Sequence, residues 1–280
     1  MWSRRKVLLA AAVVFTALYY SVAAEKQLYM AQDAVDYLYD KCRKEAMAKL
    51  IHSGVLRQEL NLSAGFQKAW SDHTQCPRLI PGAIKEHIAA LWAYVDGDED
   101  FIKTFNNQVE TMGRNISTYE NNFSFKSLHF LLMDYMMLQK PPNCKTVYTL
   151  ADKSVEAKNG SKVRLGRFTL ANLSLKELPD LDEEVVLNIT SCFYVKLGKN
   201  ICKEESSEVL LSPAEEFTVA SVMTKKDPDS QFTEIILKHS DLKSLHSSHS
   251  CDIFSRSPAV VSTHVWLVLV LLSLSLVFIC

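Results

Sequence analysis

The sequence has no surplus of charge of either sign: 31 Lys and Arg residues face 32 Asp and Glu residues, and the formal net charge is −1. Its basic residues are scattered and form no stripe interleaved with aromatics, which argues against a nucleic-acid partner. It has no C-x-x-C pair, so a zinc site is not expected and the predicted metal content is none. It also has no glycine-rich loop of the kind that cradles phosphates, and no internal repeat.

Both ends of the chain are apolar. Residues 1–24 combine a basic start, an apolar run and small residues, the pattern of a secretory signal peptide. Residues 265–280 are apolar, no charge follows them, and small polar residues precede them. This layout is typical of a glycosylphosphatidylinositol (GPI) signal whose tail, 265–280, is removed after a processing region at 251–264. A C-terminal membrane helix is the alternative, although about 16 residues are fewer than the roughly 20 that span a bilayer.

Residues 25–250 remain as one domain, long enough to bury a sizeable core. Apolar residues at helical spacing predict helices in its first part, 25–142. β-rich runs separated by turn signals predict strands in its second part, 143–250. Helices followed by strands indicate an α+β fold rather than alternating βα units. The expected helices are 42–51, 65–71, 81–94, one around 101–109, and 125–139; the expected strands are 147–150, 163–170, 184–192, 209–211, 217–223 and 232–237.

Cysteines and sequons point to an oxidising, glycosylating compartment. Cys280 would leave with the tail, and the other six cysteines can form up to three disulfides in 15 connectivities. Six N-x-S/T sequons support a route through the secretory pathway to the cell surface. A sequon in a buried strand cannot carry a glycan. The six candidate asparagines are Asn61, Asn115, Asn122, Asn159, Asn172 and Asn188.

Six segments occur in an order that identifies a family. They are Asp36–Cys42, Phe123–Leu132 (F-S-F-K-S-L-H-F-L-L), Cys144–Tyr148 (C-K-T-V-Y), Val163–Thr169 (V-R-L-G-R-F-T), Thr190–Cys192 and Glu208–Phe217 (E-V-L-L-S-P-A-E-E-F). Together they resemble the ecto-mono-ADP-ribosyltransferases, the GPI-anchored NAD(P)+–protein-arginine type, over nearly the whole mature chain.

The resemblance implies a fold, a substrate and two disulfides. The fold would be an N-terminal helical part followed by a two-sheet β core with an NAD cleft, and NAD would be the donor substrate. The implied disulfides are Cys42–Cys251 and Cys144–Cys192. Cys76 and Cys202 would remain, either as a third pair or as buried free thiols.

The resemblance also locates a catalytic carboxylate. Breaking the bond between nicotinamide and ribose builds positive charge on the sugar, which a nearby carboxylate stabilises. The family supplies it from E-x-E, whose two glutamates share one face of a strand because they lie two residues apart. Glu208 matches the second glutamate, whereas Ser206 stands at the first. Glu205 would reach that face only through a β-bulge.

Two further family positions differ here. An arginine that grips the dinucleotide phosphates is replaced by Thr149, after Tyr148. The two serines of F-T-S-x-S, beside the nicotinamide ribose, are replaced by Leu170 and by Asn172, whose sequon would put a glycan at the mouth of the cleft. Arg167 occupies a variable position from which a guanidinium could reach a phosphate. The resemblance thus implies cofactor contacts at Tyr148, Thr149, Arg167 and Asn172.

Two conspicuous residues have structural interpretations. Arg164 belongs to the ordinary family pattern and is expected to be structural. His129 lies in an apolar helix and is expected to be a core histidine bonded to backbone.

Three functions follow from these residues. The first is transfer of ADP-ribose to arginines of extracellular acceptor proteins, weakened or lost through the changes at Thr149, Leu170 and Ser206. The second is a catalytically silent, glycosylated surface protein that acts by binding an unknown partner. The third is altered chemistry on the same scaffold, either NAD hydrolysis or transfer to another residue.

Overall fold

The computed structural model describes residues 26–71, 79–139, 141, 143–202, 206–226, 230–247, 251 and 253–254. The predicted signal peptide and the predicted tail lie outside these residues. Among the residues described, no helix is both long and apolar enough to cross a membrane.

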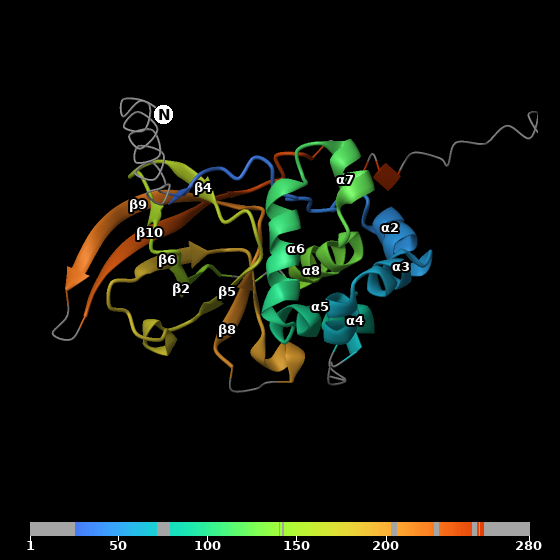
Figure 1. Cartoon of the computed structure of the whole chain (residues 1–280), viewed down its shortest axis with the longest axis horizontal. Helices are drawn as coiled ribbons and strands as arrows, with labels where there is room; N and C mark the ends of the chain where they lie inside the picture. Colours follow the sequence, from blue (N-terminus) through green and yellow to red (C-terminus); the bar gives the residue numbers. More distant parts are fainter. Residues whose placement is uncertain are drawn as a thin grey trace, which may run out of the picture.

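Helices form the first half of the described chain and pack together on one side of the molecule (Figure 1). The prediction of helices before strands is confirmed, but α3 and α7 were missed. Asn115 caps the start of α7 by accepting bonds from the N–H groups of Ser117 and Thr118. The helical elements are α2 (Arg43–Ala46), the π-helix η1 (Met47–His52), α3 (Val55–Leu62), α4 (Ala64–Ser71), α5 (Lys85–Val95), α6 (Glu99–Thr111), α7 (Ile116–Asn122) and α8 (Lys126–Gln139).

Strands form the second half. Eight of them make one mixed sheet in the order β4-β9-β10-β6-β2-β5-β8-β7, and the short β1 pairs with β3. The strands are β1 (Lys26–Gln27), β2 (Lys145–Ala151), β3 (Val155–Glu156), β4 (Lys162–Arg164), β5 (Thr169–Asn172), β6 (Val185–Ser191), β7 (Tyr194–Lys196), β8 (Glu208–Leu211), β9 (Glu215–Lys226) and β10 (Gln231–Leu242). The short 3-10 helices are η2 (Leu175–Glu177) and η3 (Gly198–Ile201).

The sheet is nearly divided between β2 and β5. Strand β2 pairs with β6 along its whole length, but its pairing with β5 is a single residue pair, Tyr148 with Asn172. The predicted two-sheet core therefore takes the form of two groups of strands that this one pair joins into a single sheet. Strands β2, β5 and β8, which carry the site positions that the resemblance implies, meet at the division.

One predicted strand was wrong. The run 163–170 is broken into β4 and β5 at a bend that contains Gly166, whose φ is +71°. A Cβ atom at this glycine would lie 2.6 Å from the Cβ of Ala31. The chain bends here because segment 26–31 crosses close to it, a long-range contact that local sequence does not reveal.

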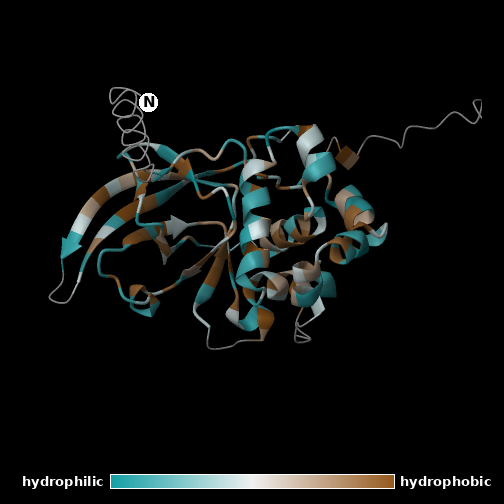
Figure 2. Cartoon of the chain, in the orientation of Figure 1, coloured by the Kyte–Doolittle hydropathy of each residue, from teal (hydrophilic) through white to brown (hydrophobic). Residues whose placement is uncertain are grey.

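The helical and β-rich parts are held together by buried apolar side chains and by short polar contacts. Hydrophobic residues concentrate along the strands and the inner helices in Figure 2, and α8 is buried over most of its length. The hydroxyl of Tyr94, from α5, donates to the carbonyl oxygen of Phe168 at 2.6 Å. The amide of Asn106, from α6, donates to the same oxygen at 3.3 Å. These bonds fix the start of β5 against the helices.

Two disulfides tie distant parts of the chain together. Cys42 is bonded to Cys251, 209 residues away, and Cys144 is bonded to Cys192. Both are the pairs that the family resemblance implies. Cys202 is also disulfide-bonded, to a partner outside the described residues, so its predicted pairing with Cys76 stays a prediction. Such bonds form and persist in oxidising compartments.

Candidate functional site

The candidate site is built on three adjacent strands, β2, β5 and β8. Register pairs Tyr148 with Asn172, and Asn172 with Glu208. Directly opposed residues of neighbouring strands project from the same face of a sheet. All three side chains are half-buried. Tyr148, Asn172 and Glu208 therefore form one row across the division of the sheet, which we call the Glu208 row.

Ser206 and Glu208 lie together at the start of β8. The Ser206 hydroxyl donates to Glu208 Oε2 at 3.2 Å, and the backbone N–H of Glu208 donates to Ser206 Oγ at 3.2 Å. The hydroxyl thus bonds to the carboxylate beside which the family places a second carboxylate. Ser207 donates to Glu177, which belongs to η2. Glu205, the alternative partner of Glu208, lies outside the described residues.

Thr149 does not project freely from β2. Its hydroxyl donates to the backbone carbonyl oxygen of Leu170 at 3.0 Å, across the division between β2 and β5. Leu170 packs against the core of the helical part. The two positions at which the resemblance expects an arginine and a serine therefore bind each other, through a side chain and a backbone group.

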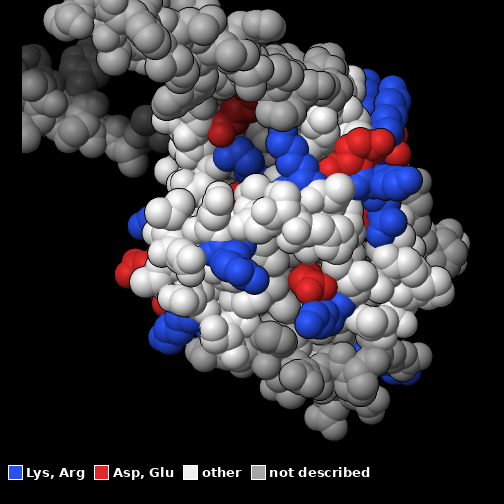
Figure 3. All heavy atoms as spheres, turned by 90° about the vertical axis from the view of Figure 1, so that its right-hand side faces the viewer, with Lys and Arg blue, Asp and Glu red and all other residues white. Residues whose placement is uncertain are grey.

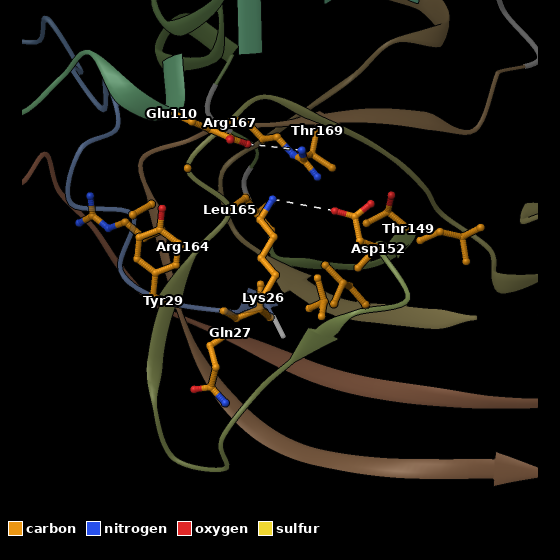
Figure 4. Close-up of a pocket in the computed structure, with 17 residues that line it drawn as sticks. Lys26, Gln27, Tyr29, Glu110, Thr149, Asp152, Arg164, Leu165, Arg167 and Thr169 are labelled. Atoms are coloured by element: carbon orange, nitrogen blue, oxygen red, sulfur yellow. Dashed lines mark ion pairs between the residues drawn. The ribbon is translucent and has the colours of Figure 1, made fainter. Parts of the chain in front are cut away.

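A small pocket lies beside Thr149 (Figure 4). Its volume is about 70 Å³, and its wall includes Thr149, Thr169 and Arg167 together with residues 26–29 and Ala31. Ligand pockets usually measure about 300–1,000 Å³. The pocket is therefore well below the usual size of a ligand pocket.

The segment 26–31 covers this pocket and is bonded in place. Lys26 N–H donates to the Ser154 carbonyl at 3.0 Å, and Arg164 N–H donates to the Tyr29 carbonyl at 3.0 Å. The ammonium of Lys26 lies 3.9 Å from the carboxylate of Asp152 (Figure 4). The segment therefore acts as a fixed wall of the pocket.

Arg167 lines this pocket and also an adjoining open hollow of about 1,020 Å³ along α6. Its guanidinium lies 3.4 Å from a carboxylate oxygen of Glu110 on α6, and both side chains are partly exposed (Figure 4). An exposed pair of this kind is weak. The guanidinium is therefore available to an anionic ligand at the cost of a weak contact.

Arg164 and His129 have the structural roles expected of them. Arg164 is buried and its guanidinium lies 2.5 Å from Asp36. His129 is buried, and its Nε2 donates to the Val35 carbonyl at 2.7 Å because that oxygen can only accept. Nδ1 then accepts from the Tyr39 hydroxyl at 3.0 Å. Desolvation by burial lowers the pKa of His129 to about 3.

A second polar cluster surrounds the buried carboxylate of Glu215. It accepts bonds from the Ser191 hydroxyl at 2.5 Å, the Cys192 N–H at 2.7 Å and His239 Nδ1 at 2.8 Å. Burial raises the pKa of Glu215, and these bonds oppose the rise. Ligand atoms of Cys192, Glu215 and His239 lie within 4.8 Å of one another. The sulfur of Cys192 is in a disulfide, so it offers no thiolate to a metal.

Sequence patterns did not indicate several residues that line the pocket beside Thr149 or contact Ser207. Glu110, Asp152 and segment 26–31 line the pocket, and Glu177 contacts Ser207. None of them belongs to a motif, and each reaches the site through tertiary packing. The one sequence signal was the position of Glu110 directly after Val109, at the edge of the apolar face of α6.

Charges are mixed on the helical side of the molecule. Figure 3 shows basic and acidic residues interspersed among neutral ones on that face. A surface of this kind creates no large field of one sign.

Comparisons with known proteins agree with the motifs. The family model for NAD:arginine ADP-ribosyltransferases matches residues 28–244. Ecto-ADP-ribosyltransferase 3 of Mus musculus is 33% identical over 235 residues, 79% of this chain and 62% of that protein. GPI-linked NAD(P)(+)–arginine ADP-ribosyltransferase 1 of Oryctolagus cuniculus is 30% identical over 217 residues, 70% of this chain and 66% of that protein. The matched region thus spans somewhat less than two thirds of these relatives.

The fold has a solved counterpart. The crystal structure of the eukaryotic mono-ADP-ribosyltransferase ART2.2 superposes with a TM-score of 0.62 at 22% identity, covering 79% of this chain and 98% of that one. Another structure, of an ART2.2 mutant, is a complex with NAD. Likeness at this identity establishes the fold, and the family model establishes membership. The chain belongs to the NAD:arginine ADP-ribosyltransferase family.

Proposed function

We propose that this chain is a GPI-anchored cell-surface glycoprotein of the family whose arginine-transfer activity is weak or lost, and that it acts mainly by binding. The bond from Thr149 to the Leu170 carbonyl carries the proposal. A threonine brings no charge to a phosphate, and this one already uses its hydroxyl within the protein.

The chemistry of the reaction explains why the replaced residues lower the rate of transfer. Transfer breaks the bond from ribose C1 to the nicotinamide nitrogen, nicotinamide leaves with the bonding electrons, and the acceptor nitrogen attacks the sugar. We assign to Glu208 the role of stabilising positive charge on the sugar. A missing phosphate clamp, a missing ribose contact and a missing acceptor carboxylate each remove a contact at the scale of about 10²–10³ in rate. Together the three leave little turnover.

The second candidate is NAD hydrolysis or transfer to a residue other than arginine. Two observations favour it: Glu208 is retained, and Arg167 lies in the wall of the pocket beside Thr149 with only a weak partner. For this second function, Arg167 binds the phosphates of NAD. The absence of a carboxylate at Ser206 shifts the acceptor from arginine to water or to another residue.

The test uses the mature chain secreted from eukaryotic cells. Isothermal titration with NAD measures binding, and labelled NAD with an arginine-rich protein measures transfer; released nicotinamide measures hydrolysis. We expect transfer at or near the background of the Glu208→Gln control. Transfer well above that control would overturn the proposal. Nicotinamide release without transfer, abolished by Glu208→Gln and by Arg167→Ala, would establish the second candidate instead.

A further inference from the structure

The sequon at Asn172 lies inside the candidate site, and the structure distinguishes it from the sequon at Asn188. A glycan is attached through the side-chain nitrogen Nδ2. Asn188 lies in β6, in the interior of the sheet, and its Nδ2 donates to Glu234 Oε1 at 2.9 Å. Asn172 is half-buried, and within the described chain its amide makes no side-chain hydrogen bond. The attachment atom is therefore engaged at Asn188 and free at Asn172.

The asparagines of the other four sequons all lie on the surface. Asn61, Asn115, Asn122 and Asn159 are exposed. The cap at Asn115 uses Oδ1 and leaves Nδ2 available. These four sites therefore accept a glycan without any change in the fold, and they serve as references for the two strand sites.

The neighbours of Asn172 give its modification a consequence. Glu208 stands opposite it on β8, and Tyr148 stands opposite it on β2. Opposed Cβ atoms in antiparallel strands lie about 4.5–5.5 Å apart. A sugar ring on Nδ2 is larger than this spacing, so it would project over the carboxylate of Glu208.

We propose that Asn172 carries an N-linked glycan that shields Glu208 from reagents in solution. In the modification, Nδ2 loses a proton and bonds to C1 of the first sugar. The bond from C1 to phosphate breaks, and the lipid pyrophosphate of a lipid-linked oligosaccharide donor leaves. The shielding rests on the proposed function only in taking the Glu208 row as the site.

Occupancy is measured on the full chain expressed in glycosylating eukaryotic cells. Peptide-N-glycosidase in heavy-oxygen water marks each asparagine that carried a glycan, and mass spectrometry reads the peptides. We expect most molecules to be marked at Asn172 and few at Asn188. An unmarked Asn172 in a chain marked at Asn159 would overturn the proposal.

Shielding is measured by labelling carboxylates with a water-soluble carbodiimide and an amine. We expect Glu208 to react several-fold faster in Asn172→Gln than in the natural chain, while the exposed Glu156 reacts equally in both. Asn159→Gln removes a remote sequon and Ser174→Thr retains the Asn172 sequon; both should leave Glu208 protected. Equal labelling of Glu208 with and without the Asn172 glycan would refute the shielding.

Enzymatic removal of glycans from the folded natural chain provides a second route that does not depend on the folding of a variant. Removal leaves Asp at position 172, and it should likewise raise the labelling of Glu208 above that in the untreated chain. Neither measurement uses NAD, so a failure of the proposed function and a failure of this inference give different results.

Discussion

The hydroxyl of Thr149 lies 3.0 Å from the carbonyl oxygen of Leu170, and this bond bridges the division between β2 and β5. The same two strands are joined in register by one residue pair, Tyr148 with Asn172. A site that binds a dinucleotide across these strands would have to break or avoid the bond. Two of the positions that differ from the family motifs are therefore in direct contact with each other.

Restoring the family residues should restore chemistry. We expect Thr149→Arg, Leu170→Ser and Ser206→Glu together to raise arginine transfer above background by at least about 10²-fold, because they supply a phosphate clamp, a ribose contact and an acceptor carboxylate. The measurement is incorporation of labelled NAD into an arginine-rich protein.

The control for this experiment supplies a positive charge without the planar guanidinium group of arginine. Thr149→Lys in place of Thr149→Arg should recover less, since an ammonium cannot bind a phosphate in a bidentate manner. Glu208→Gln should abolish the gain. A triple variant that binds NAD but stays at background would show that these three positions do not limit the reaction.

Glu59 makes stability depend on pH. It is buried on α3 and accepts bonds from the N–H groups of Lys126 and Ser127, at the start of α8. Desolvation by burial raises the pKa of Glu59 from 4.5 to about 7. The folded state holds this proton more tightly than the unfolded state, so the free energy of unfolding falls as pH rises from about 4.5 to about 7.

The size of this effect is at most roughly 3 kcal/mol, at about 1.4 kcal/mol per pKa unit. Urea unfolding of the natural chain and of Glu59→Gln at about pH 5 and about pH 7.5 measures it, because the difference between the two chains should change over this range. A difference between the natural chain and Glu59→Gln that stays constant with pH would refute the assignment.

His129 acts in the opposite direction. Its folded pKa, about 3, lies below the ordinary value of 6.5, so the unfolded state takes up a proton that the folded state excludes. Its contribution to stability is complete above about pH 6.5 and is lost as pH falls toward 3. We expect the ring signals of His129 in nuclear magnetic resonance to stay constant from about pH 8 to about pH 5 in the folded protein. Titration of the ring within that range would contradict the buried network.

Gly166 should tolerate no side chain. Gly166→Ala places a Cβ atom 2.6 Å from that of Ala31 and forces a positive φ on alanine. We expect a loss of about 2 kcal/mol or more in the free energy of unfolding. Gly160 also has a positive φ but has nothing within 4 Å, so Gly160→Ala should cost only about 1 kcal/mol.

The double variant Ala31→Gly, Gly166→Ala isolates the clash from the backbone strain. It should recover part of the loss if residue 31 crosses Gly166 as the structure shows. Additive effects of the two changes would place segment 26–31 elsewhere.

Much of the fold was predictable because local pattern carries it. Helical spacing marked α5, a long apolar run marked α8, and β-rich runs marked β6 and β10. Spacing by two placed Ser206 beside Glu208, as the structure shows. Strand order was not predictable, because the register that sets Asn172 between Tyr148 and Glu208 depends on contacts between distant segments.

The pocket beside Thr149 was also only partly predictable from the sequence. Sequence motifs pointed to Thr149 and Arg167, and both lie in its wall. Its other side is made by residues 26–29 and 31, which carry no motif and are held by backbone bonds to Ser154 and from Arg164. Backbone bonding of this kind leaves no signature in side-chain identity.

The Cys42–Cys251 bond closes a ring around nearly all of the described chain. A protease that cuts once between these cysteines produces two pieces that remain one covalent molecule. Only a cut before Cys42 or after Cys251 divides the molecule without reduction. Nicked and intact forms would therefore migrate alike on a non-reducing gel and separate only after a thiol is added.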